Sequence, residues 1–169
     1  MNHRKKRPRV IGERQGRWLL NLYPPFLLNR IRVLEIRSGF RYCRVRVAKS
    51  LLTRNLNGST FGGSIFSAAD PFYPLMYWQV MARRGEAVRV WLKSASISYL
   101  RPANSSLTLE FSLSDKDLAL ALSALDREGR FVWTYRTEAV DRSGKSCAVI
   151  ETEVYLRRPL RDQKGVSAF

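Results

Sequence analysis

The segment from residue 63 to residue 82 constrains the fold more than any other part of this chain, because it is apolar on nearly every face of a helix. Its apolar side chains are Ile65, Phe66, Ala68, Ala69, Phe72, Tyr73, Leu75, Met76, Tyr77, Trp78, Val80 and Met81. A helix that is apolar all round is a buried helix. We therefore predict one long central helix over residues 63–82, enclosed by the rest of the chain.

On either side of this segment, alternation of apolar and polar side chains with a period of two predicts β-strands. The predicted strands lie at residues 33–36, 43–47, 88–99, 107–113, 131–136 and 148–156. Within 88–99 the apolar positions change from even to odd residue numbers. A bulge near Lys93 and Ser94 would explain this change, and so would burial of both faces of the strand.

Two short helical units complete the predicted order of elements. An apolar helix over residues 18–23 precedes Pro24 and Pro25, which restart the chain as a second helix. This unit packs on the domain or on a partner subunit, or it lies on a membrane surface as an amphipathic helix. Ser114 starts a further helix that Gly129 ends. Strands grouped around one central helix predict an α+β fold, with a curved antiparallel sheet wrapped around that helix and an N-terminal helical extension.

The chain carries a net charge of +16, from 30 Lys and Arg against 14 Asp and Glu, so we expect an anionic partner or substrate. Nucleic acid, an anionic membrane surface and a phosphate-bearing molecule such as coenzyme A all fit this charge. A length of 169 residues predicts one domain. Two cysteines make no disulfide framework and predict a cytoplasmic protein. No apolar run approaches the roughly 18 residues that a membrane span needs.

The reactive side chains exclude several kinds of active site. The one histidine, His3, lies in a basic stretch, which disfavours Ser-His-Asp and Cys-His catalysis. Cys43 and Cys147 are too few for a zinc site, and the sequence has no phosphate-binding loop or dinucleotide fingerprint. We expect no metal and no cofactor. An enzyme with this inventory must use carboxylate, amide and hydroxyl groups.

A glycine-rich loop before the central helix carries such groups. If the helix begins near Gly62 or Gly63, the first N–H groups have no partner within the helix and can stabilise an oxyanion. Asp70 follows about two turns later between apolar neighbours, which favour a raised carboxyl pKa. Pro71 and Pro74 each remove a helical N–H and predict a kink beside Asp70. This combination predicts a site for acyl transfer.

The loop reads Asn55-x-x-Gly58-x-x-Phe61-Gly62-Gly63, Asp70 falls nine residues after Phe61, and the later segment 98–103 reads Ser-Tyr-Leu-Arg-Pro-Ala. These motifs resemble the N-x-x-G-x-x-H-G-G loop, the acid and the Y-x-x-P-A segment of the hotdog-fold acyl-CoA thioesterase superfamily. They are most similar to a poorly characterised branch of domain-of-unknown-function proteins. That branch shares a Y-P-P-F-L opening, an N-x-x-G-T-x-F-G-G-S loop and an A-D-P-F-Y helix, here at residues 23–27, 55–64 and 69–73. The resemblance covers roughly residues 17–158.

The resemblance implies a single hotdog domain, at residues 16–158. The basic composition of the two ends predicts a flexible arm at 1–15 and a C-terminal tail at 159–169. It also implies a homodimer, or a tetramer, with a thioester of coenzyme A or of acyl-carrier protein bound at the subunit interface. Coenzyme A would enter as part of the substrate.

The same resemblance suggests catalytic roles. Gly62 or Gly63 would polarise the thioester carbonyl, and Asp70 would act as a general base on water or as a nucleophile that forms an anhydride. Asn55 would orient the loop, the carbonyl or the water. The histidine of the usual motif is Phe61 here, so one hydrogen-bonding group is lost.

Substrate contacts are expected from the loop and from the strand at 88–99. The candidates are Phe61, Ser64, Phe66, Lys93, Ser94 and Arg101. Lys93 and Arg101 would receive phosphates, although a solvated basic surface is the simpler explanation for each. The predicted function is hydrolysis of a thioester to acid and thiol. One alternative is an acyl-CoA-binding hotdog protein without catalysis. Another is a basic protein that binds nucleic acid or an anionic surface, although the sequence has no RNA-binding signature.

Overall fold

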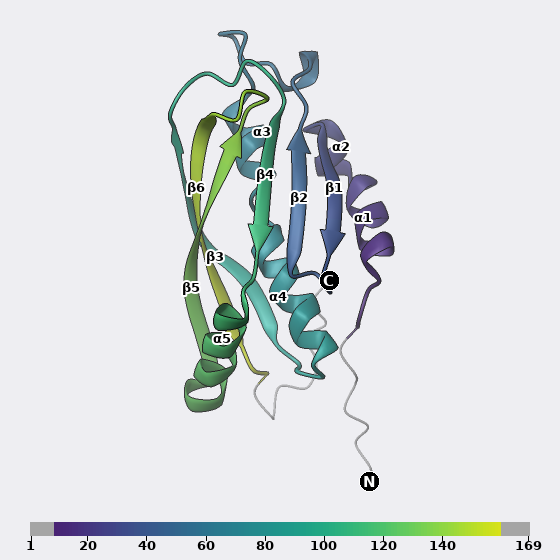
Figure 1. The fold of residues 1–169 in the computed structure, drawn as a ribbon, viewed down its shortest axis with the longest axis vertical. Helices are drawn as coiled ribbons and strands as arrows, with labels where there is room; N and C mark the ends of the chain where they lie inside the picture. Colours follow the sequence, from purple (N-terminus) through teal and green to yellow (C-terminus); the bar gives the residue numbers. More distant parts are fainter. Residues whose placement is uncertain (1–8, 160–169) are drawn as a thin grey trace.

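One antiparallel sheet curves around a central layer of helix in the computed structural model of the chain (Figure 1). The structure describes residues 9–159. The strands are β1 (Ile31–Arg37), β2 (Tyr42–Val47), β3 (Arg89–Tyr99), β4 (Leu107–Ser112), β5 (Arg130–Val140) and β6 (Ser146–Arg157). Their order across the sheet is β1-β2-β4-β5-β6-β3, and every neighbouring pair is antiparallel. The predicted α+β hotdog fold is confirmed.

The central layer consists of two helices, α3 (Gly62–Ser67) and α4 (Phe72–Arg83), instead of the single helix predicted over 63–82. Pro71 and Pro74 have no N–H to donate to the carbonyls four residues earlier, so the helical hydrogen bonds cannot continue there. The chain turns and restarts with Pro71 as the N-cap of α4. Asp70 lies in that turn. The prediction of an unbroken helix is wrong, but the predicted distortion beside Asp70 is confirmed.

The helix α4 fills the concave side of the sheet. Its residues Phe72, Met76, Tyr77 and Met81 are fully buried. The ring of Phe72 stacks on that of Phe111 in β4, with centroids 4.8 Å apart. Such an aromatic pair adds about 0.5–1.5 kcal/mol beyond the area it buries. These contacts hold α4 against the sheet, and they fix the turn and α3 at one end of the molecule.

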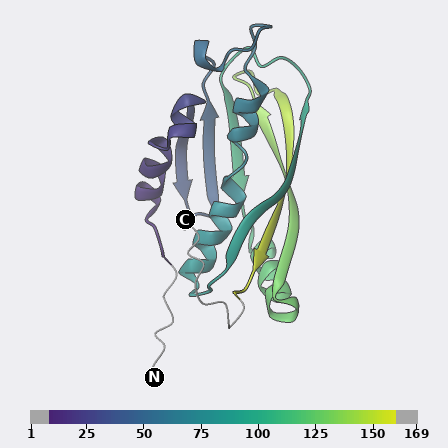
Figure 2. The ribbon, with the colours of Figure 1, turned by 180° about the vertical axis from the view of Figure 1, so that it is seen from behind.

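The N-terminal unit of α1 (Glu13–Asn21) and α2 (Pro24–Leu28) lies beside β1, at one edge of the sheet (Figures 1 and 2). The carboxamide of Asn21 donates to the Val33 carbonyl at 3.1 Å and accepts from the Val33 amide at 2.8 Å. These bonds occupy the middle of the free edge of β1. The unit therefore packs on the domain through that edge.

The chain is already packed before α1. The Ile11 amide donates to the Gln79 side chain at 2.8 Å, and the Gln79 amide group donates to the Arg9 carbonyl at 3.3 Å. Within the expected arm at 1–15, the backbones of Arg9 and Ile11 thus bond to a side chain of α4, and Glu13 begins α1. The rest of that arm, residues 1–8, and all but the first residue of the expected tail at 159–169 lie outside the described residues.

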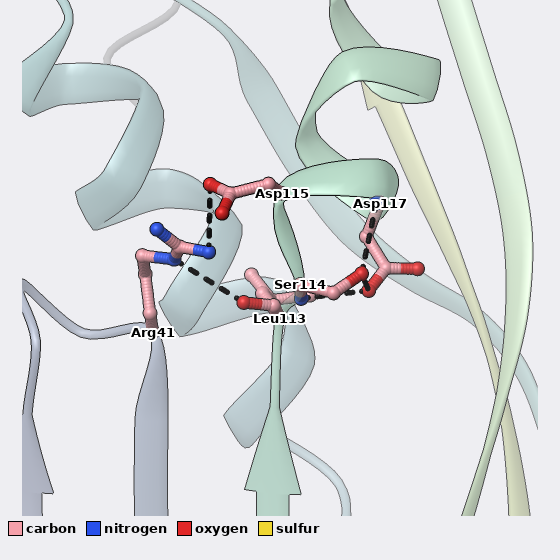
Figure 3. A network of polar contacts seen from close by, with 5 residues as sticks. All are labelled: Arg41, Leu113, Ser114, Asp115 and Asp117. Atoms are coloured by element: carbon pink, nitrogen blue, oxygen red, sulfur yellow. Dashed lines mark hydrogen bonds and ion pairs between the residues drawn. The ribbon is translucent and has the colours of Figure 1, made fainter.

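The predicted helix start at Ser114 is confirmed, and the helix that follows it is α5 (Asp115–Glu128). A short 3-10 helix, η1 (Leu51–Thr53), lies between β2 and α3. The Ser114 hydroxyl accepts from the Asp117 amide at 3.1 Å, and the Asp117 carboxylate accepts from the Ser114 amide at 2.8 Å (Figure 3). Arg41 ties this helix start to β2, since its guanidinium lies 2.9 Å from the Asp115 carboxylate (Figure 3).

Strand β3 forms the other edge of the sheet. Its pairing with β6 shifts register between Leu92 and Ser94. Of the two explanations for the change in apolar parity, the structure therefore supports the bulge. In the described part of the chain, no helix combines the length and the apolar character needed to cross a membrane.

Candidate active site

A pocket of about 450 Å³ lies between the glycine-rich loop and the segment that follows β3. It is lined by Asn55, Ser59, Thr60, Phe61, Gly62, Gly63, Ile65, Tyr99, Leu100, Arg101, Pro102 and Ala103. Thr60 joins the two walls, because its amide and its hydroxyl both donate to the Ala103 carbonyl, at 3.0 and 3.2 Å. The two sequence motifs, far apart along the chain, thus form one site.

Asn55 holds the loop closed. Its side-chain amide donates to the Ser59 hydroxyl at 2.9 Å, and its side-chain oxygen accepts from the Ser59 amide at 3.0 Å. Its own backbone amide donates to the Ser59 carbonyl at 2.8 Å. Gly58 permits this tight turn because its φ is +80°, a conformation that glycine adopts without strain. With its polar atoms engaged in this way, Asn55 sets the shape of the loop that precedes α3.

The backbone amides of Gly62 and Gly63 lie at the start of α3. The Phe61 amide donates to the Thr53 carbonyl at 2.6 Å, but across residues 9–159 no group accepts from the amides of Gly62 or Gly63. A Cβ at position 62 would come within 3.0 Å of the Tyr99 ring, and one at position 63 within 3.0 Å of the Phe61 ring. Glycine is therefore required at both positions for these two aromatic rings to form the pocket wall.

The pocket is positively charged. Arg101 is its one charged lining residue among those described, and its Nε donates to the Ser146 carbonyl at 2.8 Å. No carboxylate of the described residues lines the pocket. A negative ligand or a developing oxyanion is therefore favoured here over a positive one.

Asp70 lies outside this pocket, in the turn between α3 and α4. Its side chain reaches the protomer surface, yet the surrounding atoms remove enough water to raise the pKa of the carboxyl above its ordinary value. A carboxylate with a raised pKa is a better proton acceptor than an ordinary one. The group suits general-base chemistry if a substrate reaches it.

Residues 12–156 match the model of a protein family described as a domain of unknown function, DUF4442. The chain belongs to this family. No curated protein matches it.

Solved structures share the fold of this DUF4442 protein at low sequence identity. A Pseudomonas aeruginosa protein described as a probable thioesterase superposes with a TM-score of 0.77 at 17% identity, over 90% of this chain and 99% of that one. A Haemophilus influenzae thioesterase superposes at 0.65 with 13% identity, over 93% and 98% of the two chains. The E. coli PaaI protein from the phenylacetic acid degradation operon superposes at 0.58 with 16% identity, over 86% and 91%. These likenesses establish the fold.

The predicted site residues of the DUF4442 chain divide into two groups. The structure brings together Asn55, Phe61, Gly62, Gly63 and Arg101 around the pocket. Ser64, Phe66, Asp70, Lys93 and Ser94 do not line it.

Three of the predicted residues that do not line the pocket, Ser64, Lys93 and Ser94, have other partners. Ser64 is buried, and its hydroxyl donates to the Asn29 side chain at 2.8 Å, so it ties α3 to the end of α2. At the bulge in β3, Lys93 and Ser94 both bind Glu153 of β6, at 3.2 and 2.9 Å. The Ser94 hydroxyl and then the Lys93 ammonium hold the pKa of Glu153 below its usual range. Lys93 and Ser94 thus stabilise the sheet edge.

Tyr99, Thr60 and Leu100 are pocket residues that the sequence-based candidates omitted. The resemblance of segment 98–103 to a superfamily motif was the signal that could have found Tyr99 and Leu100. Thr60 carries no such signal, because its role depends on a partner 43 residues away. Within residues 9–159, no group of three or more His, Cys, Asp or Glu side chains could hold a metal ion.

Proposed function

We propose that this DUF4442 protein is a thioesterase that hydrolyses an acyl-CoA or acyl-carrier-protein thioester to acid and thiol. The observation that carries the proposal is the pair of unpartnered amides at Gly62 and Gly63, on the wall of a pocket of about 450 Å³. A volume of this order suits a small ligand or part of a larger one. Fold neighbours described as thioesterases support the same reaction class.

The proposed reaction needs no group beyond those of the chain and water. Water attacks the thioester carbonyl carbon while the Asp70 carboxylate takes a proton from it. The carbonyl oxygen becomes an oxyanion that accepts from the Gly62 and Gly63 amides. The C–S bond then breaks, the sulfur leaves with the proton that Asp70 holds, and a carboxylic acid and a free thiol remain.

One protomer cannot supply both groups to a single thioester. Gly62 begins α3, and Asp70 lies in the turn beyond the end of that helix at Ser67, so about 9 Å of helix separates the two. Amides at a helix start point away from the body of the helix, so an oxyanion bound to them lies farther still from Asp70. We therefore assign the base to Asp70 of the partner subunit in a homodimer, with the thioester between the two copies.

The sheet offers one edge for such a dimer. Strand β3 is an edge strand, and its residues from Arg89 to Tyr99 are largely half-buried or exposed in the single protomer. An exposed edge strand carries unpaired N–H and C=O groups that favour pairing with a second copy. Tyr99, at the end of β3, also lines the pocket. A dimer through β3 would therefore bring the partner close to the proposed site.

The experiment is hydrolysis of acyl-CoAs from acetyl to palmitoyl, and of an acyl-carrier-protein thioester, with detection of the released thiol. Both cysteines are buried, so the protein itself contributes little thiol signal. Asp70→Asn should lower turnover roughly 10²–10⁴-fold, the usual contribution of a general base. Asp115→Asn is the matched control, because its carboxylate is exposed at the start of α5 and does not line the pocket.

A second function is favoured by Phe61, whose ring stands against Gly63 where the related motif has a histidine. In that function the pocket binds the thioester without hydrolysing it. Ligand-dependent stabilisation of the fold without release of thiol by any substrate would support binding alone. Turnover that survives Asp70→Asn at the wild-type rate would refute the proposed mechanism.

A further inference from the structure

The outer surface of the N-terminal unit is apolar, although it faces solvent. Six side chains of α1, α2 and their connection are between 42% and 71% exposed: Trp18, Leu19, Leu22, Tyr23, Leu27 and Leu28. The neighbouring η1 adds Leu51 and Leu52, which are 86% and 71% exposed. The Ala48 amide donates to the Arg30 carbonyl at 3.0 Å, so the segment that leads into η1 passes beside the link between α2 and β1. Grouped exposed apolar side chains of this kind mark an interaction site.

A groove of about 430 Å³ lies within this surface, between the N-terminal unit and the outer face of β1 and β2. One side of the groove is apolar and is formed by Leu22, Leu27 and Ile31. The other carries three arginines, Arg30, Arg32 and Arg46. No described carboxylate lines the groove. Its chemistry therefore fits an anionic group attached to an apolar chain.

Among the described residues, the arginines of the groove have no counter-charge. Arg32 and Arg46 are direct cross-strand neighbours, and two like charges in that position destabilise a sheet. On the same two strands, Arg37 and Arg44 instead flank Glu35, each at 3.5 Å. None of the ion pairs formed within residues 9–159 includes an arginine of the groove.

Arg46 is the clearest case. Its Nε is buried and has no hydrogen-bond partner among the described residues. A guanidinium nitrogen without an acceptor leaves part of the hydrogen-bonding capacity of Arg46 unused. Because no described carboxylate lines the groove beside it, the charge of Arg46 favours an anion there.

We propose that the N-terminal unit docks on the surface of an anionic lipid bilayer, with a lipid phosphate or carboxylate in the arginine groove and the exposed apolar side chains in the interfacial region. Trp and Tyr beside Leu, with Arg at the margin, is the composition of segments that lie in the membrane interface. The net charge of +16 attracts the whole protein to such a surface. Two further exposed arginines of α1, Arg14 and Arg17, extend the positive margin. This inference does not depend on the proposed hydrolase activity.

The test is co-sedimentation of the full chain with vesicles at physiological ionic strength, about 0.15 M. Vesicles of phosphatidylcholine alone are compared with vesicles in which a third of the lipid is phosphatidylglycerol or phosphatidylserine. We expect binding to the anionic vesicles only. Each basic residue near a membrane contributes about 1 kcal/mol, so Arg32→Gln/Arg46→Gln should lower the partition coefficient roughly 30-fold.

The matched control is Arg37→Gln/Arg44→Gln, which removes the same charge from the same two strands but outside the groove. We expect it to lower partition much less than the groove variant. A second pair of variants tests the apolar contacts. Leu22→Ser/Leu27→Ser should weaken vesicle binding, whereas the control Leu120→Ser, at an exposed position of α5, should not. Thermal unfolding of each variant verifies that it is folded.

Several outcomes would overturn the inference. Equal losses in the groove variant and its charge-matched control would mean that net charge alone attracts the protein. Binding of inorganic phosphate in the groove without binding to vesicles would mean that the site takes a soluble anion. Absence of vesicle binding, together with loss of a dimer or tetramer in Leu22→Ser/Leu27→Ser, would assign the surface to a second copy of the chain.

Discussion

Gly62 lies so close to Tyr99 that a Cβ at position 62 would come within 3.0 Å of the tyrosine hydroxyl oxygen. This contact joins the start of α3 to the end of β3 and sets the width of the pocket between them. Tyr99 is 56% exposed, so its ring can swing outward if it is pushed. The ring and the amide of Gly62 therefore keep their relative position only while residue 62 has no side chain.

We expect Gly62→Ala to lower kcat/KM for thioester hydrolysis roughly tenfold or more, because displacement of the Tyr99 ring misplaces the substrate. The free energy of unfolding should change by less than about 1 kcal/mol, since alanine favours a helix more than glycine does. Steady-state kinetics and urea unfolding measure the two effects. Gly12→Ala is the control, because a Cβ there would meet nothing within 4 Å. Full activity of Gly62→Ala would show that the Tyr99 contact is irrelevant to catalysis.

The raised pKa of Asp70 predicts the acidic limb of the pH–rate profile. Proton removal from water requires the ionised carboxylate, and desolvation moves its pKa upward. The midpoint of the acidic limb of kcat/KM should therefore lie above the usual aspartate value of about 3.9. Activity should be present above that midpoint and lost below it.

Stability provides an independent check on the same group. Asp70→Asn should leave the melting temperature unchanged or raise it slightly, because the amide removes a partly desolvated charge. A large fall in melting temperature would mean that Asp70 has a structural role, and loss of activity in the variant would then say nothing about a base.

A buried hydroxyl pair predicts coupling between α4 and β5. The hydroxyl oxygens of Tyr77 and Tyr135 lie 2.5 Å apart in the core. Tyr77→Phe and Tyr135→Phe should each lower the free energy of unfolding by about 1–2 kcal/mol, because each leaves its partner without a good hydrogen bond.

The double variant should lose less than the sum of the two single variants, by about 1 kcal/mol, since it removes both polar groups together. Urea unfolding of the four proteins completes the cycle. Tyr155→Phe is the control, because Tyr155 of β6 is only half-buried, and it should change the free energy of unfolding by less than about 0.5 kcal/mol. Strict additivity of the two core changes would contradict the coupling.

The buried thiol of Cys43 predicts a loss of stability in alkali. Burial raises the pKa of Cys43 from 9.0 to about 12. Between these values the folded chain keeps a thiol proton that the unfolded chain has released. The contribution of Cys43 to the free energy of unfolding is therefore complete below pH 9.0. It declines toward pH 12, by up to about 1.4 kcal/mol per pH unit.

Urea unfolding at several pH values above 9 would measure this effect in the wild type and in Cys43→Ala. The variant should be less stable overall, because it leaves a cavity. Its stability should fall less steeply with pH than that of the wild type. Parallel curves would exclude an ionisation of Cys43 on unfolding.

Local signals in the sequence predicted much of the fold. Ser114 and Gly129 bound α5 because capping needs only neighbouring residues. The change of parity near Lys93 and Ser94 predicted either a bulge or burial of both faces, and the register shift with β6 supports the bulge. At Pro71 the sequence predicted a kink, whereas the structure has a complete break between two helices. The break occurs because Pro71 and Pro74 together remove two hydrogen bonds within about one turn of helix.

The candidate site was predicted less completely, because its geometry depends on pairs that are distant in sequence. Ser64 was expected to face the substrate, but Asn29, 35 residues earlier, accepts its hydrogen bond. Lys93 and Ser94 were expected to face the substrate as well, but Glu153 holds both. No property of these side chains alone reveals such partners.

The carboxamide of Asn21 binds both the backbone amide and the backbone carbonyl of Val33 in β1. These bonds limit how many copies of the chain could join by pairing of their edge strands. Arg17 adds a hydrogen bond to the next carbonyl of the same edge, that of Leu34, at 3.2 Å. With β1 closed in this way, β3 is the terminal strand of the described sheet that remains free for pairing. Once two β3 strands have paired, both ends of the joint sheet are β1 edges. Growth by strand addition at the ends of the sheet would therefore stop at two copies and would not produce a fibre.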